Sequence, residues 1–398
     1  MDLSTKYLKL IKWWINPPYE GNKIKAIINA KLILDDSIIE NKTLIFDKKI
    51  IKISNSINLE NCEVIDAEGH YVSAGFIDLH IHGSGGADAM DATPEALETI
   101  SSTVLQTGTT SFLATTMTMS TEDIDNALQN IQKHKENVSG AEILGIHLEG
   151  PFINVSKHGA QDKKYVQKPN MELIENYIND IRMITIAPEV DGGEDFVKHL
   201  TKKYPHIILS IGHSDANYEK SKESFSWGIS HATHLFNAMN TYHHRTPGIV
   251  GAVFDSDITC DIIPDLVHTH PSALEITYKM KKDKLILITD AMRAGCMKCG
   301  SYDLGGQTVK VSDGKATLKN GTLAGSVLKL NEALLNMTKH TSMTRIEALN
   351  AVTKIPAQKL GVKKGQLKEG YDADIAIFDE DFSIISTIVA GEVKYNKG

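Results

Sequence analysis

The sequence predicts an α/β protein: a (β/α)8 TIM barrel joined to a small β-sandwich built from both ends of the chain. Eight short apolar runs alternate with helix-like stretches through the middle of the 398 residues. Both ends consist instead of short alternating strands, and no low-complexity linker or fixed-period repeat separates these regions. We therefore expect an N-terminal extension over 1–22, a small β-domain from 23–73 and 359–398, and a barrel domain over 74–358.

Composition excludes several classes of protein. The chain carries 42 Lys and Arg against 50 Asp and Glu, a formal net charge of −8, so no nucleic-acid partner is expected. No apolar run approaches the ~20 residues that span a bilayer, so no membrane partner is expected either. Four cysteines are too few for a disulfide scaffold and favour a reducing compartment, which predicts a cytoplasmic protein.

The two ends of the chain share a sequence pattern that differs from that of the middle. The first 22 residues mix Leu, Ile and Trp with Lys up to Pro17 and Pro18, which is the pattern of a short amphipathic helix that ends at these prolines. Residues 24–72 and the last 40 residues alternate apolar and polar positions between turn signals, which predicts half-buried strands. We therefore expect the two strand-rich segments to form one domain.

The middle of the chain has the pattern of strands alternating with helices. Strand-length apolar runs occupy 75–82, 109–117, 143–149, 182–190, 206–213, 229–236, 258–265 and 284–291. Helices are predicted at 94–106, 121–135, 171–179, 193–203, 215–226 and 271–281. An inserted loop or hairpin is expected over 298–325, and helices at 327–339 and 344–353 precede the return to the β-domain. Eight strands with helical crossovers predict a barrel.

Three polar side chains share one face of the first predicted strand. In GFIDLHIHG, Asp78, His80 and His82 alternate with apolar residues, and the period of two places them on the same face. A barrel strand is buried on both faces, so this polar row is costly unless something binds it. Two imidazoles at this spacing suit a borderline metal ion, although hydrogen-bonded core histidines would have the same local pattern.

The same signal recurs at other predicted strand ends. The residues concerned are His80, His82, Glu149, His213, His234 and Asp290. The carboxyl ends of barrel strands converge on one rim, where catalytic residues lie. Burying all these groups without a shared cation would be expensive. We therefore predict a site for one or two divalent metal ions per subunit, with Zn and Fe as the first candidates.

A metal site of this kind suggests hydrolysis. A divalent metal lowers the pKa of water and polarises a carbonyl, and a nearby carboxylate can carry the proton to the leaving group. Asp290 stands alone on the last predicted strand and is the candidate for this general acid/base. A further metal ligand and a helix N-cap are the alternative roles for Asp290. Cleavage of a C–N bond is the favoured reaction, but the ligands do not name the substrate.

Several motifs, taken in chain order, carry a family resemblance. They are GFIDLHIHG, HLEGPFIN, KHGAQ, IGHSDA, HATHLFNAM, HHRTPG, LITDAM and GTLAGS. The chain resembles the amidohydrolase superfamily and, within it, the N-acetylglucosamine-6-phosphate deacetylases, over nearly its whole length beyond the N-terminal extension. The resemblance implies hydrolysis of the acetamide of N-acetyl-D-glucosamine 6-phosphate to D-glucosamine 6-phosphate and acetate, in amino-sugar catabolism or recycling.

The resemblance also implies roles for individual residues. For the metals it implies Glu149, His213 and His234 at a main ion, His80 and His82 at a second ion bridged by Glu149, and Asp290 as general acid/base. The implied substrate contacts are Ala160, Gln161, Asn237, Ala238, Leu323, Ala324 and Gly325 for the acylated sugar, and His244, Arg245, Asp265, Leu266, Val267 and His268 at the phosphate. A phosphate monoester carries about 1.5 to 2 negative charges and prefers Arg with further donors. In some family members the equivalents of His244 and Arg245 cross a dimer interface, so we expect a homodimer.

Two other functions remain open at this point. Another metal amidohydrolase, such as a cyclic amidase or a deaminase, would use the same ligands at the barrel rim but would not bind a phosphate. A catalytically inert barrel that serves as a scaffold is the alternative from a different class. Cys296 and Cys299 form a CxxC pair with neither a second pair at zinc-finger spacing nor a thioredoxin-like context. We interpret them as incidental thiols.

Overall fold

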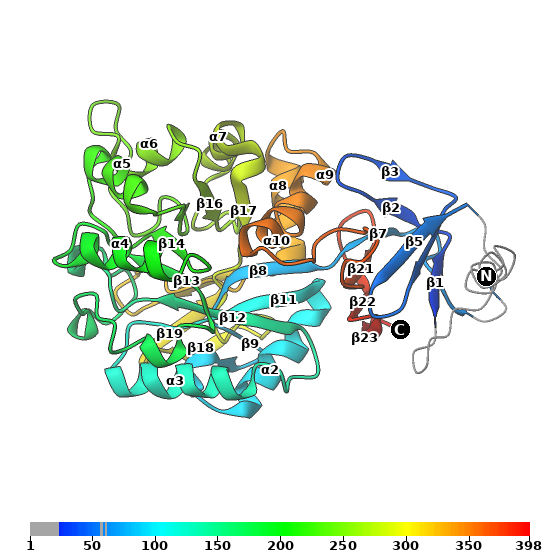
Figure 1. Cartoon of the computed structure of the whole chain (residues 1–398), viewed down its shortest axis with the longest axis horizontal. Coiled ribbons are helices and arrows are strands. Elements are labelled where there is room, and N and C mark those ends of the chain that lie inside the picture. The colour runs from blue at the N-terminus through cyan, green and yellow to red at the C-terminus, as the bar shows by residue number, and fades with distance from the viewer. Residues whose placement is uncertain (1–23, 56–58, 60–61) are drawn as a thin grey trace, which may run out of the picture.

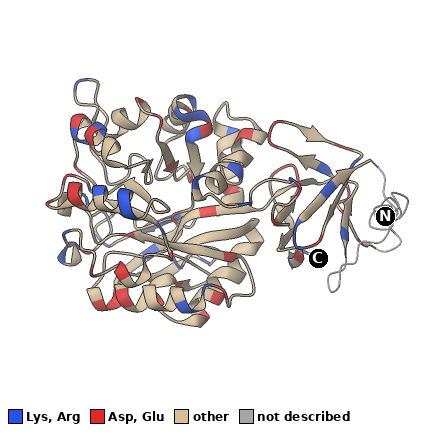
Figure 2. Cartoon of the chain, in the orientation of Figure 1, with Lys and Arg blue, Asp and Glu red and all other residues tan. Residues whose placement is uncertain are grey.

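The computed structural model describes residues 24–55, 59 and 62–398. The predicted N-terminal extension over 1–22 lies outside these described residues. The barrel and the small β-sandwich lie end to end, and the first barrel strand leaves the sandwich directly (Figure 1). Acidic and basic residues are interspersed over the outer helices in the view of Figure 2. Among the described helices, none is both long and apolar enough to cross a membrane.

Within the described part of the chain, eight parallel strands form the barrel. Their order around the sheet follows the chain: β8 (Phe76–Ile81), β11 (Thr109–Thr115), β12 (Glu142–Glu149), β13 (Ile181–Ile186), β14 (Ile208–Ile211), β15 (His231–Ala232), β16 (Thr259–Ile262) and β17 (Leu285–Leu287). A parallel bridge between Ile81 and Ala291 closes the ring from the last strand to the first. The predicted barrel is confirmed, although β15 and β17 are shorter than their apolar runs.

Helices cover the outside of the barrel (Figure 1). They are α2 (Pro94–Val104), α3 (Thr121–His134), α4 (Gly193–Lys203), α5 (Tyr218–Trp227), α6 (Gly248–Phe254), α7 (Pro271–Lys281), α8 (Leu330–His340), α9 (Arg345–Asn350) and α10 (Lys354–Leu360). The side chains of Thr93, Ser120 and Asn217 cap α2, α3 and α5 by accepting backbone N–H groups of the first turn. The α3 helix buries Ile124, Leu128 and Ile131, whose spacing places them on the face toward the strands.

One predicted helix is wrong and two short helices were missed. Residues 171–179 form turns around a short 3-10 segment, Glu175–Tyr177. A nine-residue helix is marginal by itself, and Asn176 and Asn179 favour turns because their side chains compete for backbone hydrogen bonds. The sequence of α6, GIVGAVF, is apolar on nearly every side and has no amphipathic period to detect. In α10, Pro356 lies in the first turn, where its missing N–H is tolerated.

The other strands build the small sandwich. One sheet has the order β5 (Ile50–Ser54), β4 (Thr43–Phe46), β1 (Lys25–Ile28), β6 (Glu63–Asp66). The other has the order β23 (Glu392–Asn396), β22 (Ile384–Val389), β21 (Ile375–Phe378), β7 (Tyr71–Ala74), β2 (Lys31–Ile33), β3 (Ile38–Ile39). Leu44 and Phe46 of the first sheet pack against Val72, Ile375 and Ile388 of the second in one core. The prediction that both chain ends build this sandwich is confirmed.

The insertion after the last barrel strand is a small antiparallel sheet. Its strands are β18 (Gly300–Leu304), β19 (Gln307–Ser312) and β20 (Lys315–Thr317), in that order. The Gln307 side chain donates a hydrogen bond of 2.6 Å to the backbone oxygen of Ala160. The inserted sheet therefore lies against the loop that follows β12, at the mouth of the barrel.

Candidate active site

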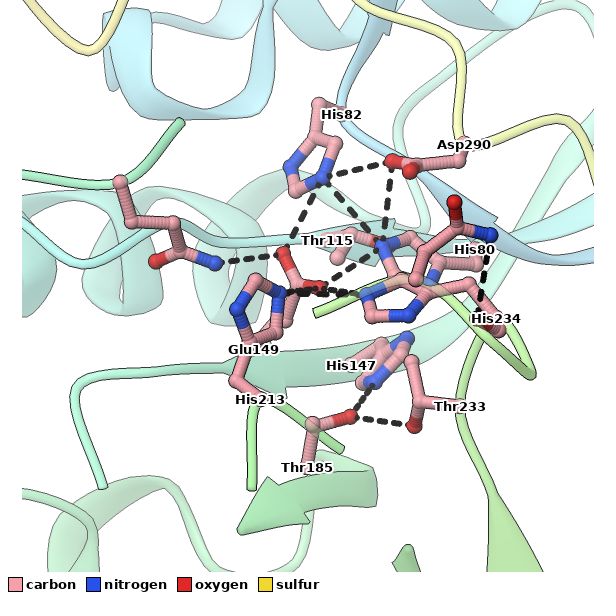
Figure 3. Close-up of polar contacts among 12 residues, drawn as sticks. His80, His82, Thr115, His147, Glu149, Thr185, His213, Thr233, His234 and Asp290 are labelled. Atoms are coloured by element: carbon pink, nitrogen blue, oxygen red, sulfur yellow. Dashed lines mark hydrogen bonds and ion pairs between the residues drawn. The ribbon is translucent and has the colours of Figure 1, made fainter. Parts of the chain in front are cut away.

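Imidazole and carboxylate side chains from distant parts of the chain meet at the carboxyl ends of the barrel strands (Figure 3). The candidate ligand atoms form two groups, and the atoms of each group all lie within 4.8 Å of one another. One group consists of His80, His82 and Asp290, and the other consists of Glu149, His213 and His234. Even the most exposed of these residues, Asp290, retains only 9% of its accessible surface. The predicted set of candidate ligands therefore lies in one buried site, although their individual roles stay predictions.

Glu149 lies between the two groups. Its Oε1 is 3.0 Å from His234 Nε2 and 3.2 Å from His213 Nε2. The same oxygen is 3.5 Å from His80 Nε2, and the other, Oε2, is 3.3 Å from His82 Nε2. A single carboxylate that faces four imidazole nitrogens is placed to serve both groups.

The backbone turns sharply where these side chains leave their strands. His213, His234 and Asp290 all take left-handed conformations, with φ of 47°, 31° and 49°, which are uncommon outside glycine and cluster at functional sites. The Asp290 N–H donates to the His80 oxygen (2.8 Å), which fixes the turn against the first strand. The carboxylate consequently faces the first strand, with Oδ1 3.2 Å from His82 Nε2 and 3.4 Å from His80 Nε2.

The donor set fits a divalent cation. His213 Nδ1 donates to the backbone oxygen of Lys157 (2.8 Å), because a carbonyl can only accept. In the neutral imidazole, Nε2 then presents a lone pair toward the Glu149 carboxylate, and two acceptors face each other at 3.2 Å. A cation between them would satisfy both, and imidazole nitrogen with carboxylate oxygen is the ligand chemistry of Zn and Fe sites.

The site keeps its carboxyl groups ionised. Burial would raise the pKa of Glu149, but the neighbouring imidazoles of His80, His213 and His234 outweigh burial and hold this pKa well below its usual range. Burial also opposes ionisation of Asp290, yet His80 and His82 lower its pKa to about 2. Both side chains are therefore hydrogen-bond acceptors and potential cation ligands at neutral pH.

Asp261 on β16 positions the loop that carries His234. One carboxylate oxygen accepts the backbone N–H of His234, and the other lies 2.9 Å from His231 Nε2. His231 Nδ1 in turn lies 2.7 Å from Thr259 Oγ1. Asp261 and His231 are fully buried. The sequence analysis missed Asp261, whose only signal was a lone carboxylate in the run TCDII.

We expect Asp261→Ala to lower the free energy of unfolding by about 3–5 kcal/mol, because it leaves buried polar groups of His231 and His234 unpaired. Denaturant unfolding measures this change. The exposed Asp257 provides the control, and Asp257→Ala should alter stability by less than about 0.5 kcal/mol. Equal stability of the Asp261 and Asp257 variants would contradict the assignment.

A second buried network supports the ligands from below. His147 Nδ1 donates to the Leu79 oxygen (3.0 Å), so Nε2 accepts from Thr185 Oγ1 at 2.7 Å. Burial lowers the pKa of the His147 imidazole well below its usual range and keeps it neutral. Its ring lies edge-on to the His80 ring, with centroids 4.6 Å apart. His147 therefore packs against His80 and holds the first strand, but both of its nitrogens are engaged elsewhere and it belongs to neither group of candidate ligands.

Asp78, the deepest member of the polar row on β8, joins the first and last strands. Its Oδ2 accepts a 2.6 Å hydrogen bond from Thr289 Oγ1, and its Oδ1 accepts the His80 N–H. Burial raises the pKa of Asp78 to about 7, although these hydrogen bonds oppose the rise. The contact places Asp290, the residue after Thr289, beside His80.

A cavity of about 250 Å³ opens above the ligand groups. Predicted residues that line it are His82, Glu149, Ala160, Gln161, His213, His234, Asn237, Ala238, His268, Asp290, Leu323 and Gly325. Lining residues that were not predicted are Met117, Gly159, Leu304 and Thr322. None of these four side chains carries a charge or an imidazole, so nothing distinguished them from core or loop residues.

Gln161 holds Glu149 in place. Its Nε2 donates to Glu149 Oε2 (2.9 Å), and its Oε1 accepts the Thr118 backbone N–H (2.7 Å). Both ends of this amide are therefore engaged, and Gln161 is buried. The side chain links the end of β12 to the segment after β11.

The predicted phosphate contacts are only partly assembled around this cavity. His268 lines it, with Nδ1 2.7 Å from Asp265 Oδ2. His244 and Arg245 are exposed, contact each other at 2.7 Å, and do not line the cavity. Four further predicted contacts also lie outside the lining: Asp265, Leu266 and Val267, predicted at the phosphate, and Ala324, predicted at the acylated sugar. A single chain thus places His268, but not Arg245, at the site.

Comparisons with known proteins bear on this geometry. Residues 71–394 match the model of the amidohydrolase family. An N-acetylglucosamine-6-phosphate deacetylase from Lysinibacillus sphaericus is 43% identical over 356 residues, which cover 87% of this chain and 92% of the relative. The crystal structure of the Pasteurella multocida enzyme of the same name has a TM-score of 0.89 at 33% identity, covering 94% of this chain and all of the other. A Mycobacterium smegmatis deacetylase variant in complex with N-acetyl-D-glucosamine-6-phosphate has a TM-score of 0.87 at 25% identity, with the same coverage.

Proposed function

This chain belongs to the amidohydrolase family and, within it, to the N-acetylglucosamine-6-phosphate deacetylases, and we propose that it hydrolyses N-acetyl-D-glucosamine 6-phosphate to D-glucosamine 6-phosphate and acetate. The observation that carries this function is the buried ring of imidazoles around Glu149, with Asp290 beside it, at the floor of a cavity. The reaction cleaves the amide C–N bond and adds one water.

The chain offers ligands for one or two divalent ions. Glu149, His213 and His234 would hold the main ion. His80 and His82, with Asp290 next to them, would hold a second ion that Glu149 bridges. A bound Zn or Fe ion would activate water and polarise the acetamide carbonyl.

Asp290 would carry the proton. His80 and His82 lower its pKa, so the carboxyl is ionised at neutral pH and free to take up a proton, and a bound ion would acidify the attacking water and so favour this transfer. The same carboxyl would then give this proton to the departing amine, which restores the carboxylate. Asp290 lines the cavity and its Oδ1 lies 3.2 Å from His82 Nε2, which supports a role beside the residues that would hold the ions.

Other lining residues would hold the sugar. Asn237 would contact it through its side chain and Ala238 through its backbone, and both line the cavity. Ala160, Gln161, Leu323 and Gly325 of the lining, with Ala324 next to them in the chain, would complete the contacts around the acylated sugar. His268 would bind the phosphate, beside the stretch Asp265 to Val267, whose first residue orients the His268 ring.

The phosphate site would be completed by a second copy of the chain. Arg245 and His244 are exposed and lie outside the cavity of their own chain, which supports a homodimer in which each copy lends them to the other. All four cysteines are free thiols, which supports a cytoplasmic location. A phosphorylated amino sugar is the proposed partner, with no nucleic acid or membrane.

We expect Arg245→Ala to raise the KM for N-acetylglucosamine 6-phosphate by about 10- to 100-fold, because a hydrogen bond to a charged group contributes about 1.5–3 kcal/mol. Steady-state kinetics measure it. Unphosphorylated N-acetylglucosamine serves as the internal control, and its kcat/KM should stay unchanged. An unaltered KM for the phosphorylated sugar would remove Arg245 from the phosphate site and favour an amidohydrolase that does not bind a phosphate.

The function is tested by acetate release from N-acetylglucosamine 6-phosphate, with and without a chelator. We expect rapid release that the chelator abolishes, and far slower release from the unphosphorylated sugar. The 6-phosphate of the C4 epimer, N-acetylgalactosamine, tests selectivity for the sugar. Release of ammonia without acetate would favour a deaminase, and purified protein without bound metal or activity would favour an inert scaffold.

A further inference from the structure

We propose that Met117 and Leu304 form the pocket for the methyl end of the acyl group and thereby limit the length of the acyl chain that the enzyme removes. This inference rests on the proposed function and deepens it by assigning the determinants of acyl specificity. Both side chains line the cavity above the ligand groups.

The order of strands around the barrel places the two ends of the substrate on opposite sides. Asn237 and Ala238 follow β15, the sixth strand of the ring, and His268 follows β16, the seventh. Met117 follows β11, the second strand, which lies opposite the sixth in a closed ring of eight. The cavity therefore extends from the sugar and phosphate contacts on one side to Met117 on the other.

The substrate has a matching arrangement, with its acyl group at one end and its phosphate at the other. In a pyranose ring, C2 lies across the ring from C5, so the C2 acetamide and the C6 phosphate point to opposite ends of the molecule. With the phosphate at His268, the acetamide extends toward the second and third strands. Its carbonyl would then lie beside the ligand groups around Glu149, which ends β12, the third strand, and its methyl group would continue toward Met117.

Hydrogen bonds tie the Met117 segment to the reacting centre. The residue after Met117, Thr118, donates its backbone N–H to Gln161, and Gln161 donates to Glu149 Oε2. The Met117 N–H points the other way, toward Met90 Sδ at 3.4 Å. Met117 is thus connected to the bridging carboxylate through one side chain, without being a ligand candidate itself.

The wall formed by Met117 and Leu304 is apolar, as is the methyl group at the end of an otherwise polar substrate. Met117 and Leu304 are only 3% and 2% exposed, and both belong to an apolar cluster with Met292 and Val309. The inserted sheet forms the back of this cluster, because Leu304 lies on β18 and Val309 on β19 and both are buried with Met117. A longer acyl chain would therefore have to displace packed side chains.

The test compares acyl chains of increasing length. N-acetyl-, N-propionyl- and N-butyryl-glucosamine 6-phosphate are offered to the wild-type enzyme, Met117→Ala and Leu304→Ala, and carboxylate release gives kcat/KM for each. One extra methylene in a closed apolar pocket costs about 10- to 200-fold, so the wild type should discriminate against propionyl by about that factor. In each variant, the ratio of propionyl to acetyl kcat/KM should rise about 10-fold or more.

Val309→Ala is the matched control. Val309 is buried in the same cluster but does not line the cavity, so this variant should keep the wild-type ratio even if it is destabilised. Thermal unfolding checks that each variant is folded. Should Met117→Ala fail to fold, Leu304→Ala carries the same prediction on a different element.

The outcomes separate this inference from the proposed function. A wild-type enzyme that releases acetate, together with folded variants whose propionyl-to-acetyl ratio equals that of the wild type, overturns the acyl pocket alone. A wild-type protein that releases no acetate from the acetyl substrate overturns the proposed function and the pocket together. A raised ratio in the cavity variants but not in Val309→Ala supports the pocket.

Discussion

Asp290→Asn is expected to give a folded protein whose kcat falls by about 10²- to 10⁴-fold, the usual contribution of a positioned general acid/base. The amide keeps the size of the side chain and can still accept the hydrogen bonds that reach Oδ1, but it cannot take up a proton. The Glu149, His213 and His234 group does not include Asp290. This variant should therefore retain the main metal while it loses turnover.

Kinetics and elemental analysis on the same preparation measure both effects. Asp283 is the matched control, since it is exposed and precedes the amino end of β17, whereas Asp290 follows the carboxyl end of that strand. Asp283→Asn should leave kcat within about twofold of the wild type, as for most exposed substitutions. A near-full rate in Asp290→Asn would show that another group transfers the proton.

Glu149→Gln is expected to remove bound metal and to reduce turnover by at least about 10³-fold, because the metal supplies several kcal/mol of transition-state stabilisation. Glu149 is the carboxylate shared by both ligand groups, and its two oxygens face imidazoles of each. The Gln side chain lacks the negative charge of the carboxylate. Its NH2 group also replaces one of the two oxygens, at a position where an electron-pair donor to the metal is needed.

Metal content after equilibration with a defined free metal concentration measures the loss in Glu149→Gln. Glu142, at the other end of the same strand, is exposed and forms an ion pair with Lys364. Glu142→Gln should therefore retain full metal content and activity. A Glu149→Gln protein that binds metal like the wild type would contradict the bridging position of this carboxylate.

The barrel and its ligand ring could be predicted because both depend on local, repeating signals. His80 and His82 alternate with apolar residues on a strand, and this pattern cannot be placed in a barrel without burying them. Glu149, His213 and Asp290 end further apolar runs, and parallel strands bring their carboxyl ends to one rim. The order of the parallel strands alone therefore predicts that these side chains meet at one rim of the barrel.

Other features depend on pairings that no local pattern encodes. Asp261 acquires its position from His231 and His234, which belong to the neighbouring strand and its loop. In the sequence, Met117 and Leu304 look like any core residue, because a cavity wall and a core have the same composition. Arg245 is exposed and lies outside the cavity of its own chain, and its proposed place depends on a second copy that the sequence of one copy does not locate.

Metal removal followed by stepwise restoration tests whether the ligand ring works as one metal-dependent catalytic centre. The enzyme is stripped with a chelator, titrated with Zn or Fe, and assayed for bound metal and for acetate release from N-acetylglucosamine 6-phosphate at each step. We predict that the stripped enzyme is inactive and that activity rises in proportion to bound metal in the wild type, but not in Glu149→Gln. Full acetate release by protein shown to be free of metal would contradict the assignment.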